Sequence, residues 1–151
     1  HTGMTMKADQ LRRLLTQAGL CGIYHLPSSE IDALCAAAES LDYRCFKVSF
    51  RESDDIGDAL VECGRSLGFP EWYGANLDAL SDCLTDLSWN EASGYIIIIS
   101  QADALHARGE PFRQINQVLS NAIHEWQKQN IPFWIFYDIR SDGLATLPTL
   151  A

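Results

Sequence analysis

Tyr95-Ile96-Ile97-Ile98-Ile99 is a run of apolar, mostly β-branched residues that ends at Ser100. Residues of this kind favour strands, and a strand that is apolar on both faces is covered on both sides by other elements. The run is far shorter than the roughly 18 apolar residues that a membrane-spanning helix needs. It therefore predicts a central strand of a buried sheet.

Helix and strand patterns alternate outward from this strand. After it, a short helix near 101–105 and a long amphipathic helix over 110–129 lead to an aromatic strand at 133–137. Before it, the pattern predicts helix 8–15, strand 23–26, helix 28–41, strand 44–50, helix 56–67 and a helix from 76 to about 87. Strands separated by helices imply right-handed crossovers. We expect an α/β fold with a small, mostly parallel sheet and helices packed on it.

The charge balance limits the kinds of partner. The chain has 11 Lys and Arg against 20 Asp and Glu, a net charge of −9, and a pI near 4.7. With 151 residues, 47% of them hydrophobic, it is long enough to fold as one compact domain without a metal or disulfide. Negative charge disfavours nucleic acid and anionic membranes and favours a basic protein. We expect no cofactor, no metal ion, no nucleic acid and no membrane association.

The cysteines and the N-terminal residues indicate the cellular compartment in which the protein is expected. The five cysteines form no C-x-x-C motif, so we expect small buried thiols in a reducing cytoplasm: Cys21, Cys35, Cys45, Cys63 and Cys83. The start of the chain lacks the layout of a secretory signal. Residues 1–3, before Met4, have the character of an expression-tag remnant.

Acidic side chains gather in one part of the sequence. No Lys or Arg occurs between Arg65 and Arg108, whereas six acidic residues do. Asp78, Asp82 and Asp86 are spaced by four, so on the predicted helix their carboxylates share one face. Like charges at this spacing cost a few tenths of a kcal/mol per pair. Helix stability alone therefore does not favour the arrangement.

Two large aromatic residues, Trp72 and Tyr73, directly precede this helix. Rigid aromatic anchors beside carboxylates suit a protein interface with a cationic partner. A solvated helix face that follows a loop with a core aromatic residue explains the same pattern. The spacing alone leaves both interpretations open.

The run from Leu67 to Thr85, LGFPEWYGANLDALSDCLT, closely resembles the signature of the barstar family, intracellular bacterial inhibitors of secreted ribonucleases such as barnase. The resemblance covers roughly Arg44 to Asp138. It implies a barstar-like core at 44–140, preceded by a helix/strand/helix extension at 4–43 that packs on the core. Residues 141–151 are expected to be a flexible tail.

The resemblance also implies a function and a site. A barstar-like inhibitor lays this helix and the preceding loop over the cationic active site of a basic ribonuclease, one to one, in the manner of an immunity protein. The matching positions place Asp82 at the family's central acid and Asp78 one turn earlier. The other implied ribonuclease-binding residues are Trp72, Tyr73, Gly74, Asn76 and, from the long helix, Glu125.

Two positions depart from the family pattern. Ser81 replaces a Trp and Ala75 replaces an acid, which removes a large contact and some negative charge. A barstar-fold module that binds a partner other than a ribonuclease is therefore the alternative. The sequence has no G-x-S-x-G, P-loop or H-E-x-x-H motif, and its histidines are isolated, so we do not expect an enzyme.

Overall fold

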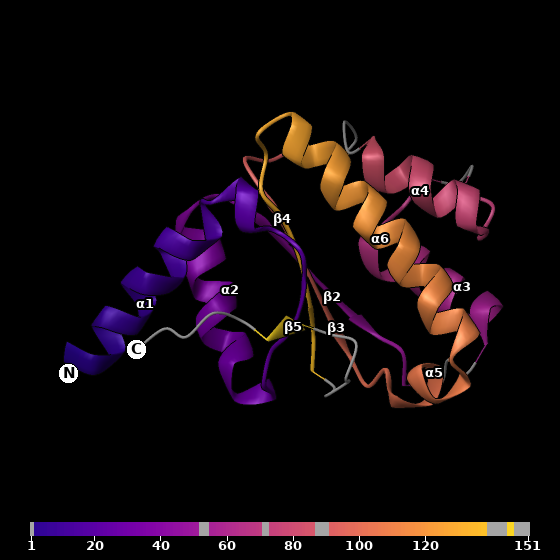
Figure 1. The fold of residues 1–151 in the computed structure, drawn as a ribbon, viewed down its shortest axis with the longest axis horizontal. Coiled ribbons are helices and arrows are strands. Elements are labelled where there is room, and N and C mark those ends of the chain that lie inside the picture. Colours follow the sequence, from indigo (N-terminus) through magenta and orange to yellow (C-terminus); the bar gives the residue numbers. More distant parts are fainter. Residues whose placement is uncertain (1, 52–54, 71–72, 87–90, 139–144, 147–151) are drawn as a thin grey trace.

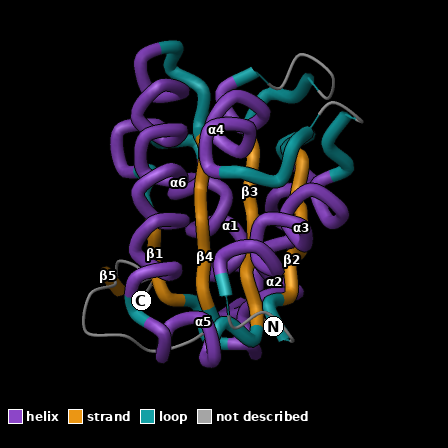
Figure 2. The backbone as a smooth tube through the Cα atoms, turned by 90° about the vertical axis from the view of Figure 1, so that its right-hand side faces the viewer, coloured by secondary structure: helices purple, strands orange, loops and turns teal. Residues whose placement is uncertain are grey.

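The computed structural model describes residues 2–51, 55–70, 73–86, 91–138 and 145–146. Five strands form one sheet in the order β2-β3-β4-β1-β5, and every neighbouring pair is parallel. Figure 2 shows the sheet between its helices. The strands are β1 (Ile23–His25), β2 (Arg44–Ser49), β3 (Tyr95–Ser100), β4 (Phe133–Tyr137) and β5 (Ala145–Thr146). The expected α/β fold with a parallel sheet is confirmed.

Helices cover both faces of the sheet, which gives three layers (Figure 1). One layer is made of elements that precede β2 in the sequence: α1 (Thr2–Leu15), α2 (Ile31–Ser40) and the 3₁₀ turns Ala18–Leu20 and Ser28–Glu30. The opposite layer contains α3 (Ile56–Leu67), α4 (Leu77–Thr85), α5 (Asp103–Arg108) and α6 (Glu110–Lys128). Right-handed crossovers require this division, because the path from β1 to β2 runs along the sheet in the opposite direction to the path β2-β3-β4.

The central strands β3 and β4 form the core. Their register pairs Ile97 with Ile135, and every residue of β4 is fully buried. In β3, Tyr95 to Ile99 are at most 2% exposed, as predicted from their apolar character on both faces.

The N-terminal extension is part of the same sheet. β1 lies beside β4, with Ile23 opposite Ile135. The Leu15 carbonyl at the end of α1 accepts hydrogen bonds from the Trp134 indole (3.0 Å) and the Tyr43 hydroxyl (3.2 Å). These bonds satisfy a helix-terminal carbonyl that would otherwise lack a partner. The extension thus closes the sheet face opposite α3, α4 and α6.

Several boundaries differ from the sequence expectation. α1 begins at Thr2 and not at residue 8, so Thr2 and Gly3, expected to belong to a tag remnant, are helical, and α5 covers Asp103–Arg108 and not 101–105. α4 ends at Thr85, whereas the leucine pattern predicts an end near Leu87. Leu87 itself lies outside the described residues. Within 141–151, expected to be a flexible tail, Ala145 and Thr146 pair with β1 as the short strand β5. The rest of that segment lies outside the described residues.

Candidate functional site

α4 separates a buried face from an acidic one. Leu80, Cys83 and Leu84 are at most 1% exposed and pack toward α6 and α3, whereas Asp78 and Asp82 are exposed. The helix begins at Asn76, whose side chain accepts a hydrogen bond from the Ala79 amide (2.8 Å). An asparagine cap of this kind fixes where the first turn starts. The buried face and the cap together hold the two carboxylates toward solvent.

Asp86 is not a third member of that face. It is the C-terminal cap of α4, with φ −121° and ψ 83°, and only its amide continues the helix by donating to the Asp82 carbonyl (3.0 Å). Of the three carboxylates expected in one row, only those of Asp78 and Asp82 lie on the helix. Asp86 lies just beyond its last residue. The cause is the early end of α4, which the spacing of four could not reveal.

The loop before α4 is anchored by Tyr73. Its hydroxyl donates to the Leu60 carbonyl (2.7 Å), and its ring packs edge-on against Phe69 with 4.8 Å between centroids. A Cβ on Gly64 of α3 would lie 2.5 Å from the Tyr73 ring, so only glycine leaves room for it. The ring and hydroxyl of Tyr73 are thus engaged within the protein. Gly64 was not foreseen as part of the site, because a contact between residues so far apart leaves no local pattern.

The chain enters α4 through a tight turn. Gly74 is exposed, and a Cβ there would lie 3.1 Å from the side-chain nitrogen of Asn76. Ala75 has φ 52°, in the left-handed region that non-glycine residues rarely adopt. The turn therefore places Gly74 and Asn76 at the exposed start of the helix. Trp72, predicted to bind the partner, lies outside the described residues.

Glu125 comes from α6, which packs beside α4 (Figures 1 and 2). Its carboxylate is exposed and pairs with the Lys128 ammonium at 3.0 Å. The adjacent Trp126 donates its indole N–H to the Leu84 carbonyl (2.7 Å), which ties the two helices together near their ends. The structure thus brings Glu125 to the layer that also carries Asp78 and Asp82.

The chemistry of this region is electrostatic. Burial raises the pKa of the Cys83 thiol, and the charges of Asp82 and Asp86 raise it further. A thiol in this setting stays protonated and is a poor nucleophile.

In the part of the chain that the structure describes, no group of three or more His, Cys, Asp or Glu is placed to hold a metal ion. None of the helices described is both long and apolar enough to cross a membrane.

Comparison with solved structures shows similarity of fold. The ORC2 protein of Aeropyrum pernix in its ADP form is 17% identical over 95% of this chain, with a TM-score of 0.56. The same protein in ADPNP–ADP complexes is 15% identical over 92% of this chain, with a TM-score of 0.52. In both cases the match spans 40% of the other chain. At these identities the likeness concerns the fold alone.

Comparison at the level of sequence is more specific. No curated protein matches the chain. The family model described as Barstar (barnase inhibitor) matches residues 43–138, which are more than half of the chain and include β2, α3, α4, β3, α5, α6 and β4. The chain therefore belongs to the barstar family.

Proposed function

We propose that this protein inhibits a basic ribonuclease of the barnase type by covering its active site with α4 and the loop that precedes it. The observation that carries the proposal is the exposure of Asp78 and Asp82 on a helix whose opposite face is buried and whose start is capped. The family model supports the choice of partner.

The mechanism is electrostatic and steric occlusion. A ribonuclease active site binds phosphates with cationic side chains, and the carboxylates of Asp78 and Asp82 occupy the places of those phosphates. Because the acids lie on a rigid helix, little side-chain or backbone ordering opposes binding. Negative charge also speeds the encounter with a basic enzyme. No covalent bond is made or broken, so the protein is an inhibitor and not an enzyme.

The N-terminal extension leaves this face open. α1 and α2 lie on the other side of the sheet from α4 (Figure 1). The proposed complex is one to one, and its formation does not require the extension to move. Its place of action is the cytoplasm, where it protects against a nuclease that has not left the cell.

Titration calorimetry against a barnase-type ribonuclease at low and physiological salt tests the proposal. We expect tight binding that weakens as salt rises, because screening reduces the attraction between opposite charges. Asp82→Ala is expected to weaken binding about 30-fold or more, the effect of losing a central interface residue. Asp32→Ala, which removes an exposed carboxylate from α2 on the opposite layer, is the matched control and leaves affinity unchanged.

Two results would contradict the proposed site. One is an affinity that does not respond to Asp82→Ala. The other is a loss of more than about 2 kcal/mol in the free energy of unfolding of that variant, because an exposed carboxylate contributes little to stability. Removal of Asp82 relieves its repulsion with Asp78 and Asp86, so we expect unchanged or slightly higher stability.

A barstar-fold binding module whose partner is not a ribonuclease is the second candidate. Ser81 and Ala75 remove an aromatic contact and a negative charge that the family pattern has at these positions. Absence of binding to a barnase-type enzyme at either salt concentration would favour this candidate. Recovery of an inhibited ribonuclease with the protein from its host's lysate would exclude it.

A further inference from the structure

Two cysteines of this chain touch each other. All five cysteines lie among the described residues and are free; Cys21, Cys63 and Cys83 are buried, whereas Cys35 and Cys45 are only partly buried. The sulfur atoms of Cys35 and Cys45 are 3.3 Å apart and form a thiol–thiol hydrogen bond. The expectation that every cysteine is a buried thiol is therefore wrong for these two.

The pair joins the N-terminal extension to the barstar core. Cys35 lies in α2 of the extension, and Cys45 is the second residue of β2, the strand at one edge of the sheet. α2 packs against β2 with Leu34 and Ala38 fully buried. β2 is held in register by its pairing with β3, where Cys45 lies opposite Ile96. The two sulfurs are thus kept in contact by elements that the core fixes in place.

Contact and access together favour a disulfide at this place. The sulfurs of a disulfide are about 2 Å apart, so small rotations of the two side chains are enough to close the bond. Groups that a fold holds in contact react with each other as if they were at very high concentration. Because both thiols are partly exposed, a small oxidant can reach them.

A metal site does not explain the pair. Structural zinc is bound by four Cys or His ligands, and two sulfurs alone leave the ion incompletely coordinated. Among the described residues, no third His, Cys, Asp or Glu joins Cys35 and Cys45 in a group that could hold a metal ion. The chemistry open to the two thiols is therefore reaction with each other.

We propose that Cys35 and Cys45 are a redox-sensitive pair that forms a disulfide by exchange with a small disulfide of the glutathione class. The thiolate of the first cysteine attacks the small disulfide, whose S–S bond breaks, and one small thiolate leaves and takes up the cysteine's proton. The second cysteine attacks the sulfur of the first and releases the second small thiol in the same way. The protein pair thereby loses two electrons and two protons, and the small disulfide is reduced to two thiols.

Cys35 makes the first attack. The pKa of Cys45 is raised to about 12, first by burial and then by its hydrogen bond with Cys35 and the charge of Glu39, while Lys47 opposes the shift. Cys45 therefore keeps its proton and is the donor of the thiol–thiol hydrogen bond. Once Cys35 carries the mixed disulfide, brief ionisation of Cys45 is sufficient, because its target is already in contact.

The disulfide ties the extension to the core. Residues 36–44, which lie between the two cysteines, contain the end of α2 and the turn into β2, so the bond closes a short loop. A closed loop lowers the entropy of the unfolded chain, and the oxidised protein is more stable as a result. α2 lies on the opposite side of the sheet from α4, so the bond leaves the face of Asp78 and Asp82 unchanged (Figure 1). The inference therefore goes beyond the proposed function and does not depend on it.

Equilibration of the full-length folded protein in mixtures of reduced and oxidised glutathione, followed by an acid quench and mass spectrometry, tests the pair. We expect a species lighter by two hydrogen atoms in which the three buried cysteines stay free. Trypsin cleaves after Arg44 and so separates Cys45 from the peptide that holds Cys21 and Cys35. Fragmentation is expected to place the link between Cys35 and Cys45.

Unfolding provides a comparison that needs no variant. In urea, the same glutathione mixtures are expected to give a ratio of linked to open protein about tenfold lower or less, because the unfolded chain no longer holds the two sulfurs in contact. A ratio that is equal in the folded and the unfolded protein would overturn the inference.

Three variants test the order of attack. Cys45→Ser is expected to stop at a mixed disulfide between Cys35 and glutathione, and Cys35→Ser to form a mixed disulfide about tenfold more slowly. Cys21→Ser, the matched control, removes a buried cysteine from the same tryptic peptide and is expected to form the link as the unaltered protein does. Circular dichroism checks that each variant is folded.

Two further results with the unaltered protein would overturn the inference. One is five free thiols in every glutathione mixture, and the other is a link from Cys45 to Cys21 in place of Cys35. No nuclease takes part in these measurements, so failure of ribonuclease binding would disprove the proposed function without altering their result.

Discussion

Asn76 caps α4 and is also one of the residues that the proposed function places in the interface. Its carbonyl oxygen accepts the Ala79 amide (2.8 Å), and the residue itself is exposed at the start of the helix that carries Asp78 and Asp82. A change at this position therefore alters the folding of α4 as well as any contact with a partner. The two effects can be separated by measuring stability.

Replacement of Asn76 by Ala is expected to lower the free energy of unfolding by about 1 kcal/mol, because the first turn of α4 loses its cap. Asn76→Asp keeps an oxygen acceptor at the same position and is expected to retain the stability. Urea unfolding followed by circular dichroism measures both. Equal stability of the Ala and Asp variants would show that the cap does not determine the start of the helix.

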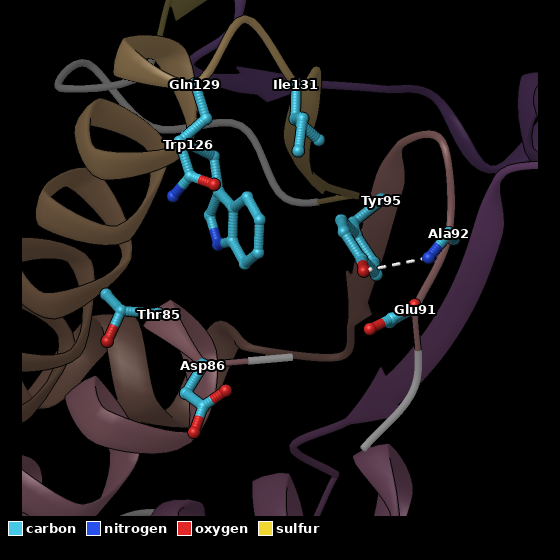
Figure 3. A pocket seen from close by; sticks show the side chains of 8 residues that line it. All are labelled: Thr85, Asp86, Glu91, Ala92, Tyr95, Trp126, Gln129 and Ile131. Carbon is cyan, nitrogen blue, oxygen red and sulfur yellow. Dashed lines mark hydrogen bonds between the residues drawn. The ribbon is translucent and has the colours of Figure 1, made fainter. Parts of the chain in front are cut away.

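The candidate site was only partly predictable from individual residues. The exposure of Asp78 and Asp82 follows from their spacing against the buried leucines, which is a local property. The contacts of Tyr73 with Leu60 and Gly64 could not be predicted from spacing, because they depend on how the loop packs against α3. The same holds for the pocket of about 420 Å³ between the C-terminal ends of α4 and α6 and the start of β3, since its walls come from three elements (Figure 3).

At the scale of elements, α3 carries two glycines that differ in their surroundings. A Cβ on Gly64 would lie 2.5 Å from the Tyr73 ring, whereas a Cβ on Gly57 would have only the Asp55 carboxylate oxygen nearby, at 3.4 Å. Both residues lie in the same helix, so helix propensity favours alanine at each. The comparison isolates the effect of the Tyr73 contact.

Gly64→Ala is expected to destabilise the protein by about 1–3 kcal/mol, because the Tyr73 ring must move and the loop before α4 moves with it. Gly57→Ala is expected to be neutral or to stabilise by up to about 1 kcal/mol. Thermal unfolding compares the two. If Gly64→Ala were as stable as Gly57→Ala, Tyr73 would not be held in the way the structure shows.

The order of helices and strands was well predicted from sequence, and the exceptions have a physical reason. Periodicity locates β3, β4 and α6 because each is long or strongly apolar. The end of α4 at Thr85 was missed, because no glycine or proline marks it and Leu87 continues the apolar spacing. The two-residue strand β5 exists only through its pairing with β1 and leaves no pattern of its own.

At the scale of the molecule, the position of the N-terminal extension was not predictable. A short strand such as β1 can pair at either edge of a three-stranded core or remain outside the sheet. Its place beside β4 is fixed by long-range pairing and by the bonds from Trp134 and Tyr43 to Leu15. Such contacts are determined by the complete fold and not by local sequence.

Buried thiols predict how the whole molecule responds to alkali. Burial raises the pKa of Cys63 from 9.0 to about 12, and the charge of Glu62 adds to this. Above pH 9.0, the ordinary pKa of a cysteine thiol, Cys63 loses its proton in the unfolded chain but keeps it in the folded protein. The contribution of Cys63 to the free energy of unfolding is therefore fully present below pH 9.0 and is lost as the pH rises toward about 12.

Cys63→Ala removes this contribution. Under reducing conditions, the variant is expected to lose stability less steeply between pH 9.0 and about 12 than the unaltered protein. The difference in slope is expected to be about 1.4 kcal/mol per pH unit for one thiol. Urea unfolding at a series of alkaline pH values measures it. Parallel pH profiles for the two proteins would mean that Cys63 ionises as easily in the folded state as in the unfolded chain.

The placement of the extension also suits the protein to practical use. α1 begins on the opposite side of the sheet from α4, and the extension is tied into the sheet by β1 (Figure 1). A linker joined ahead of α1 would attach the protein to a resin or sensor surface with its acidic helix turned outward. An immobilised form would therefore keep the face of Asp78 and Asp82 accessible, and under the proposed function it would serve as bait for the ribonuclease.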